Sequence, residues 1–417
     1  MALNQLHFEE FSCQSNIHGH TWLADEDCSW SGKLLISQIK GRIVCCAYNN
    51  TCSSGSCDMQ FVSRDVVFEE LVGKGQILAI DCFQSKHNGN VIGITTCNDS
   101  KDCCLHIFSR FTLPSFKSES PKEHTSFQWH GDDDTAQFFP LPYVPNQLTH
   151  CPLQTSGLEN SSDNTAFILL GCDNACHIFC DENQDGIFIE LDAKDHFPEL
   201  MSLNYLPIFV EIKCIQKTRL TAIGFENGLI NLMHVDIKSK TILRKHIYMH
   251  DSPISSMSLF NFPCKSNNDI HLLVAVSRSD SVLYASVQKN GFLVPVILNE
   301  SSKYDVVTCC AVNYEHFAKK LKVLIGTFGK RTLVYQCDAS LDHSMHSHSQ
   351  SKTTVLKPTQ TFDFSHPVMG IKFGDLTGDG LNEMTVISTK GMHIFQYEPS
   401  SLTKSTIYKE VLPSSNP

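Results

Sequence analysis

An apolar strand, a tight turn and a second apolar strand recur as a unit along this chain, and this recurrence restricts the possible folds more than any other feature. The first strands of the seven copies start at residues 34, 91, 167, 220, 272, 323 and 385, so most intervals are 51 to 62 residues and one is 76. The fourth copy contains Asn227-Gly228, a dipeptide typical of two-residue β-hairpin turns. Repeats of this length, with several strands each, are typical of β-propeller blades.

A further β-rich run precedes most of the hairpins and predicts an innermost strand for each unit; examples are residues 77–80, 254–260 and 306–312. We therefore predict an all-β, seven-bladed β-propeller, with a single domain over residues 1–412 and a short tail at 413–417. A β-sandwich array and an unrelated series of hairpins are the alternatives.

A propeller must close into a ring, and the first strand of the chain commonly completes the last blade. Residues 6–11 are the candidate strand, and we expect them beside residues 407–411. Two polar stretches, at about 112–164 and 338–354, predict loop insertions between blades. Such loops are where a scaffold often meets its partners.

The composition restricts the classes of function. The net charge of −11 disfavours broad contact with nucleic acid or with an anionic membrane, so protein partners are expected. The start of the chain lacks the pattern of a secretory signal, and no apolar run reaches the roughly 20 residues that span a bilayer. We therefore expect a cytoplasmic chain without direct membrane insertion, whose 19 cysteines stay mostly as thiols.

One acidic hairpin carries the most specific local motif, at residues 373–383 (FGDLTGDGLNE). Oxygen ligands at alternate positions and a glycine for the sharp turn are what a small calcium loop needs. The side chains of Asp375, Thr377, Asp379 and Glu383, with the carbonyl of Leu381, are the candidate ligands. The motif resembles the FG-GAP calcium hairpin of integrin-type propellers, although such loops usually carry Asp or Asn at the place of Thr377. The alternative is a hairpin in which the aspartates brace the turn by hydrogen bonds.

Other groups of potential ligands favour structural interpretations. Residues 181–186 (DENQDG) open like an EF-hand loop, but the following residues read as a strand, which favours a plain hairpin loop. Cys172, Cys176, Cys180 and His177 lack a second matching pair for zinc, so structural burial is expected. The last group is a cluster of three histidines, His343, His346 and His348. It lies in a serine-rich stretch, which favours a solvated linker.

The sequence contains no phosphate-binding glycine loop, no G-x-S-x-G elbow and no H-E-x-x-H helix. An enzyme of the propeller-hydrolase kind would need acids, histidines or a metal converging on the central channel. The predicted inner strands do not supply these residues in a regular register. We therefore expect no catalytic activity and no required cofactor, apart from the calcium considered above.

Several segments resemble the kaptin family of animal propeller proteins. They are residues 11–16 (FSCQSN), 197–200 (FPEL), 228–236 (GLINLMHVD), 251–255 (DSPIS), 375–381 (DLTGDGL) and 390–394 (KGMHI). The family has a second, degenerate FG-GAP hairpin in the preceding blade, but residues 313–320 of this chain carry no acidic ladder. The family also tends to end in a basic helical tail, whereas this sequence stops at residues 413–417.

The resemblance implies a non-catalytic scaffold subunit of KICSTOR, a complex at the lysosomal surface that tethers the GATOR complex. Through that tether, nutrient shortage would silence the TOR kinase. The implied partners are a second FG-GAP propeller protein, the other KICSTOR subunits and, through the assembly, GATOR. The alternative that the family name also implies is association with actin filaments in actin-rich projections. The net acidity of the chain counts mildly against actin, which is itself acidic.

Overall fold

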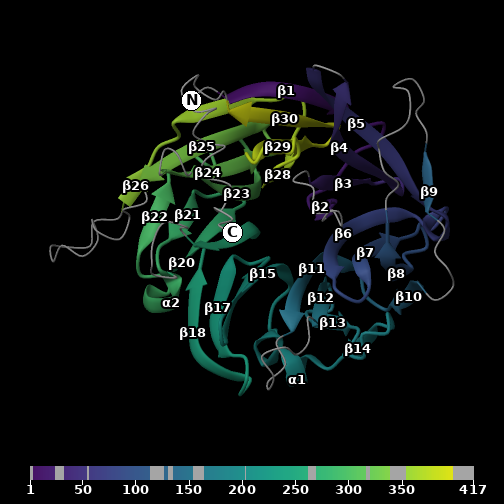
Figure 1. The fold of residues 1–417 in the computed structure, drawn as a ribbon. Coiled ribbons are helices and arrows are strands. Elements are labelled where there is room, and N and C mark those ends of the chain that lie inside the picture. The colour runs from purple at the N-terminus through teal and green to yellow at the C-terminus, as the bar shows by residue number, and fades with distance from the viewer. Residues whose placement is uncertain are drawn as a thin grey trace, which may run out of the picture.

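The structure of the protein is a computed structural model. It describes residues 3–23, 32–53, 56–112, 126–129, 135–153, 164–201, 203–261, 269–315, 320–338 and 354–397. Seven sheets stand around a central axis, and each runs outward from the axis to the rim like the blade of a propeller (Figure 1). The predicted all-β, seven-bladed propeller is therefore confirmed.

The strands of each blade follow from the axis outward. Blade 1 consists of β2 (His20–Leu23), β3 (Lys33–Gln38), β4 (Arg42–Ser53), β5 (Ser56–Phe68) and β9 (Phe127–Trp129). Blade 2 consists of β6 (Gln76–Ser85), β7 (Gly89–Cys97), β8 (Cys103–Phe111) and β10 (Ala136–Leu141). Blade 3 consists of β11 (Pro145–Leu153), β12 (Asn164–Gly171), β13 (Cys176–Cys180) and β14 (Ile189–Leu191). Blade 4 consists of β15 (Pro207–Ile215), β16 (Thr218–Phe225), β17 (Leu229–Asp236) and β18 (Thr241–Met249).

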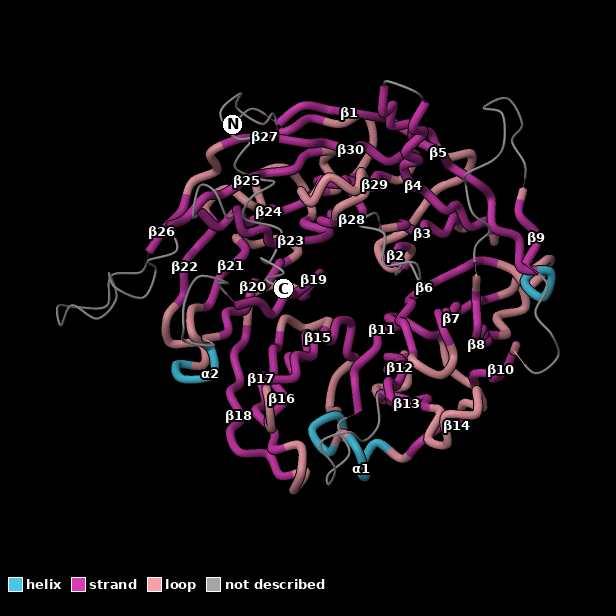
Figure 2. The backbone as a smooth tube through the Cα atoms, viewed as in Figure 1, coloured by secondary structure: helices cyan, strands magenta, loops and turns pink. Residues whose placement is uncertain are grey.

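The remaining three blades complete the ring. Blade 5 consists of β19 (Ile254–Asn261), β20 (Ile270–Val276), β21 (Ser281–Tyr284), β22 (Pro295–Leu298) and β26 (Thr354–Leu356). Blade 6 consists of β23 (Val307–Glu315), β24 (Lys320–Thr327), β25 (Arg331–Asp338) and β27 (Gln360–Asp363). Blade 7 consists of β28 (Val368–Gly374), β29 (Glu383–Ser388), β30 (Gly391–Tyr397) and β1 (Leu3–Glu10). Short helices lie at the periphery of the ring (Figure 2), namely η1 (Glu69–Leu71), α1 (Ala193–His196), η2 (Pro198–Leu200) and α2 (Val287–Asn290).

The seven hairpins found in the sequence are the second and third strands of the seven blades. The first copy, for example, forms β3 and β4, and the last forms β29 and β30. The predicted innermost strands are also present as β6, β19 and β23. Hence the repeat in the sequence corresponds to the repeat in the fold.

The apolar core lies between neighbouring blades. Because side chains alternate across a strand, Leu34 points toward blade 7 and clusters with Ile387, while Leu35 points toward blade 2 and clusters with Ile92. Each pair of adjacent blades shares one such cluster of buried apolar side chains. Both faces of a blade are therefore buried, which explains why these strands read as continuous apolar runs rather than as an alternation of apolar and polar residues.

The N-terminal strand closes the ring. β1 pairs antiparallel with β30, with Leu3 opposite Tyr397 and Glu10 opposite Gly391. The predicted role of the first strand is thus found, and its partner is the third strand of blade 7. Residues 407–411, the expected partner, lie outside the described residues. So do residues 413–417, and the domain bounds of 1–412 stay a prediction.

The first predicted insertion is only partly a loop. Within residues 112–164 the structure places β9, β10 and β11, and β11 is the innermost strand of blade 3. These strands were not predicted because the segment contains Pro140, Pro145 and Pro152, and proline is normally disfavoured in a sheet. Of the second insertion, residues 338–354, the described part reaches only the end of β25 and the start of β26.

Candidate functional site

The predicted acidic hairpin connects the two inner strands of blade 7, between β28 and β29. Asp375 follows β28 directly, and Glu383 is the first residue of β29. Gly378 and Gly380 have positive φ angles of 75° and 81°, a conformation that favours glycine. This tight backbone folds the acidic side chains back over the turn.

Asp375 braces the turn through its backbone. One carboxylate oxygen accepts hydrogen bonds from the N–H groups of Gly378 (2.6 Å) and Asp379 (3.2 Å), and the other accepts from Gly380 (2.7 Å). Asp379 in turn accepts from the N–H of Leu381 at 2.8 Å. Both aspartates therefore serve the local hydrogen bonding that holds a hairpin of this kind.

Glu383 is fully buried and fixes the first half of the loop. Its Oε2 accepts from the N–H groups of Leu376 (2.7 Å) and Thr377 (3.1 Å), and its Oε1 accepts from the hydroxyl of Thr377 (3.1 Å). Burial raises the pKa of this carboxyl to about 7, although these hydrogen bonds oppose the shift. Thr377 thus contacts Glu383 directly.

The loop gathers three acids, and one further side chain lies among them. Carboxylate oxygens of Asp375, Asp379 and Glu383 lie within 4.8 Å of one another. The side-chain amide of Gln396, from β30, donates to Asp379 Oδ2 (2.6 Å) and to Glu383 Oε1 (2.9 Å). Carboxylate oxygens are the kind of ligand that calcium prefers. However, N–H and O–H groups already donate hydrogen bonds to these oxygens. The geometry therefore fits the hydrogen-bonded hairpin better, and calcium binding stays a prediction.

The loop that opens like an EF-hand is a hydrogen-bonded turn as well. Asp181 accepts from the N–H groups of Asp185 (3.2 Å) and Gly186 (2.7 Å), and from the side-chain amide of Asn88 (2.7 Å). The last of these joins blade 3 to blade 2. The strand expected at residues 187–189 begins at Ile189 instead.

The cysteine and histidine groups are not gathered as metal sites among the described residues. Cys176 and Cys180 are buried while Cys172 is exposed, and His177 bonds to Glu190 (2.8 Å) and Asp173 (3.1 Å) instead. The cysteines whose side chains the structure describes are free thiols. The cluster of His343, His346 and His348 lies outside the described residues, as does part of the loop at 313–320.

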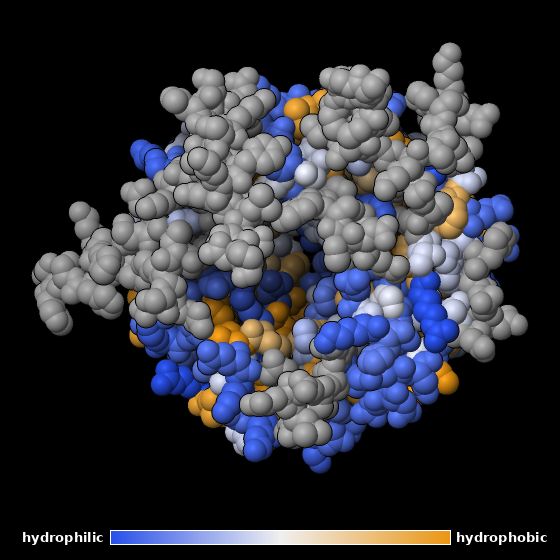
Figure 3. All heavy atoms as spheres, viewed as in Figure 1, coloured by the Kyte–Doolittle hydropathy of each residue, from blue (hydrophilic) through white to orange (hydrophobic). Residues whose placement is uncertain are grey.

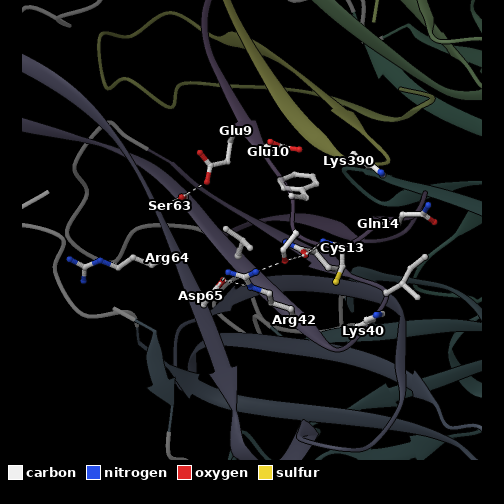
Figure 4. A pocket seen from close by; sticks show the side chains of 15 residues that line it. Glu9, Glu10, Cys13, Gln14, Lys40, Arg42, Ser63, Arg64, Asp65 and Lys390 are labelled. Carbon is white, nitrogen blue, oxygen red and sulfur yellow. Dashed lines mark hydrogen bonds and ion pairs between the residues drawn. The ribbon is translucent and has the colours of Figure 1, made fainter. Parts of the chain in front are cut away.

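A groove of about 700 Å³ lies at the seam where β1 closes the ring against blade 1 (Figure 4). Arg42 crosses it and pairs with Asp65 (Nε to Oδ1, 2.6 Å). Lys40 and Lys390 also line it, as do Glu9 and Glu10 of β1. Sequence reasoning missed this groove because its residues come from distant segments that only ring closure brings together.

The side chains that line the central channel were not predicted either. The channel encloses about 340 Å³ between the inner strands of the blades. His150 Nδ1 contacts Asp81 Oδ2 at 2.7 Å, and Glu211 and Lys372 face the same space. Burial lowers the pKa of His20, on the wall of the channel, to about 3, so this imidazole stays neutral.

Two thiols line the channel, but neither is suited to nucleophilic attack. Burial raises the pKa of Cys309 and of Cys310 to about 12. Both groups therefore stay protonated near neutral pH, whereas a catalytic cysteine needs a thiolate. The other acid of the channel wall, Asp81, contacts His150 and also accepts a hydrogen bond from the hydroxyl of Thr21 (Oγ1 to Oδ1, 3.2 Å).

The whole length of the ring has a counterpart in a known family. The family model for KICSTOR complex protein kaptin matches residues 3–407, from the closing strand β1 past the end of β30. The chain belongs to the kaptin family. Kaptin of Mus musculus, described as KICSTOR complex protein kaptin, is 27% identical over an alignment of 411 positions that covers 94% of this chain and 87% of the mouse protein.

Solved structures share the fold of this kaptin-family chain. Crystal structures of BBS1N in complex with ARL6DN, soaked with lead and with mercury, each give a TM-score of 0.52. Their sequence identities are 7% and 8%, and the likeness covers 96% of this chain and 97% and 96% of those chains. At such identity the likeness shows the fold alone.

No helix in the described part of this chain is long and apolar enough to span a bilayer.

Proposed function

We propose that this chain is a non-catalytic scaffold subunit of a KICSTOR complex. In that role it helps to tether the GATOR complex at the lysosomal surface, so that nutrient shortage lowers TOR kinase signalling. The observation that carries the proposal is the family match, which runs continuously over residues 3–407 and so includes all seven blades. The mechanism is binding by complementary surfaces, without turnover.

The chemistry of the described residues supports a binding role. The channel thiols are protonated, and the acidic hairpin uses its carboxylates to hold its own backbone. The groove beside Arg42, by contrast, presents both signs of charge along its walls (Figure 4). Mixed charge at a cleft favours recognition of a specific protein surface.

The partners proposed are a second FG-GAP propeller protein, the other KICSTOR subunits and, through them, GATOR. Recruitment to the lysosome would then come from the partners rather than from this chain, whose net charge of −11 does not favour an anionic membrane. The scaffold role needs no cofactor.

Affinity purification of the tagged full-length chain from animal cells, followed by mass spectrometry, tests the proposal. We expect the second FG-GAP propeller protein and the other KICSTOR subunits at near-equal amounts. A matched sample with a tagged unrelated propeller controls for abundant contaminants. Recovery of actin without these subunits, together with cosedimentation of the purified chain with filaments, would replace the scaffold proposal with the cytoskeletal alternative.

A further inference from the structure

The outermost strand of blade 4, β18, is an exposed strand with large apolar side chains. Eight of its nine residues pair with β17, Leu243 stands at a shift in the register, and no strand of the described residues lies on its outer edge. Five of its apolar side chains are 43% to 56% exposed: Ile242, Leu243, Ile247, Tyr248 and Met249. In Figure 3, orange apolar atoms stand out among blue ones at the lower-left rim, where β18 runs in Figure 1. A long bare edge of this kind is a template for pairing with another strand.

Four of the other six blades have an added strand or a very short strand at the outer edge, whereas blades 2 and 7 end in β10 and β1, of six and eight residues. In blade 1 the short strand β9 pairs with β5 as a fifth strand, and in blade 5 β26 pairs with β22 in the same way. Blades 3 and 6 end in strands of only three and four residues, β14 and β27. The rim of this propeller therefore accepts an added strand, and β18 offers a long edge without one in the described structure.

Packing against blade 5 holds β18 in place. Arg244 donates to the carbonyl of Gln288 in α2 at 3.3 Å, and the ring of Tyr248 lies near those of Tyr284 and Phe292, with centroids 5.9 and 5.8 Å away. The alternate residues, Lys245 and Ile247, point to the opposite face because side chains alternate along a strand. The edge is thus preformed, and ordering it on binding costs little conformational entropy.

The local charge indicates the kind of partner. Residues 237–250 contain four basic residues and no acidic one, within a chain of net charge −11. The four are Lys238, Lys240, Arg244 and Lys245. Pairing of β18 with β18 of a second copy would bring these cations close together, which is unfavourable. A strand that carries acidic residues between apolar ones would complement both the charge and the exposed apolar side chains.

We propose that the outer edge of β18 is a docking site for an extended, acidic and apolar segment of a partner protein, which adds to blade 4 as a fifth strand. Backbone hydrogen bonds would supply affinity, and the contacts with Lys245 and Ile247 would supply specificity. This inference rests on the proposed scaffold function, and it names the surface through which one partner binds.

A labelled nine-residue peptide that alternates valine and glutamate is the probe, measured by fluorescence anisotropy with the purified full-length chain. We expect binding that weakens as salt is added, and slower amide hydrogen exchange in β18. Lys245→Glu and Ile247→Glu should each weaken binding by about tenfold or more, equivalent to roughly 1.4 kcal/mol. Val72→Glu, at a side chain 68% exposed outside blade 4, is the matched control and should leave binding unchanged.

Three results with the purified chain would overturn the proposal. One is equal binding of a peptide with lysine in place of glutamate, and another is equal binding of a peptide whose backbone amides are methylated. The third is self-association of the chain, detected by sedimentation, that Ile247→Glu abolishes, because the occupant would then be a second copy. If Lys245→Glu and Ile247→Glu still recover the KICSTOR subunits at wild-type ratios, this docking site is wrong while the scaffold function stands. If the wild-type chain recovers none of them, the scaffold function itself is wrong.

Discussion

Arg219 and Glu199 form a buried ion pair that ties η2 to the sheet of blade 4. Arg219 Nε lies 2.7 Å from Glu199 Oε1, and both side chains are almost completely shielded from solvent. The hydroxyl of Thr221 also donates to this carboxylate (2.9 Å), and the guanidinium stacks 4.0 Å above the ring of Phe197. Residues 197–200, which are among the segments that resemble the kaptin family, are therefore held by a buried polar network.

Replacing Glu199 by alanine should destabilise the fold strongly. The change leaves the Arg219 guanidinium buried without its partner, which typically costs about 3–5 kcal/mol of the free energy of unfolding. Urea denaturation of the full-length chain measures the effect. The double variant Glu199→Leu with Arg219→Met should lose less than the single variant, since it removes both charges. Equal stability of Glu199→Ala and wild type would show that the pair does not hold η2.

Replacing Asp375 by alanine should destabilise the hairpin whether or not calcium is present. The N–H groups of Gly378, Asp379 and Gly380 lose their acceptor at this partly exposed turn, and hydrogen bonds to a charged group contribute about 1.5–3 kcal/mol. Thermal unfolding of both proteins, in chelator and in added calcium, measures the loss of stability and its dependence on calcium. Because Gln396 already donates to Asp379 and Glu383, we expect calcium to leave the melting temperature of the wild type unchanged. A calcium-dependent rise that Asp375→Ala removes would instead support the metal site.

Glu211 should make stability depend on pH. Burial in the channel raises its pKa from 4.5 to about 7, although Lys372, Lys213 and His150 oppose the shift. The folded chain therefore keeps a proton that the unfolded chain releases, and this contribution is complete below pH 4.5 and is lost as the pH rises through 7. Each pKa unit corresponds to about 1.4 kcal/mol.

The variant Glu211→Gln cannot ionise, so its stability relative to wild type should rise between pH 5 and pH 8. Denaturation of both proteins at each pH gives this difference, and the effects of the neutral histidines His18 and His20 largely cancel in it. A difference that is the same at both values of pH would contradict a raised pKa for Glu211.

Replacing Gly370 by alanine should disturb the wall of the channel. A Cβ atom at this position would overlap Nε2 of His20, so the imidazole must move. Such overpacking typically costs about 1–3 kcal/mol. The double variant Gly370→Ala with His20→Ala should recover much of the loss, which a double-mutant cycle detects. Additive effects of the two changes would show that the residues do not meet.

Much of the fold was predictable because its repeat is local. Continuous apolar runs in the sequence predict hairpins such as β3–β4 and β29–β30. Those runs arise because both faces of each blade are buried. β11 was missed for the opposite reason, since its prolines and polar residues hide a strand that occupies the innermost position of blade 3. Pairing with β12 fixes that strand, and a pairing between segments is not visible in the local pattern.

The same contrast, between features that are local in the sequence and features that depend on distant segments, applies to the candidate sites. The acidic hairpin is contiguous, so the approach of Asp375, Asp379 and Glu383 was expected from their spacing. Gln396, which donates to two of these acids, lies on the neighbouring strand and was not expected. The groove beside Arg42 and the channel around Glu211 depend on ring closure, and no spacing in the sequence reveals either of them.

The most direct test of the central claim is TOR kinase activity in nutrient-starved animal cells that lack this chain. Phosphorylation of TOR substrates is measured before and after amino-acid withdrawal, with re-expression of the wild-type chain as the control. If the chain is a scaffold subunit of KICSTOR, phosphorylation should persist during starvation without it and fall normally once it is restored. A normal fall in the absence of the chain would contradict the proposed function.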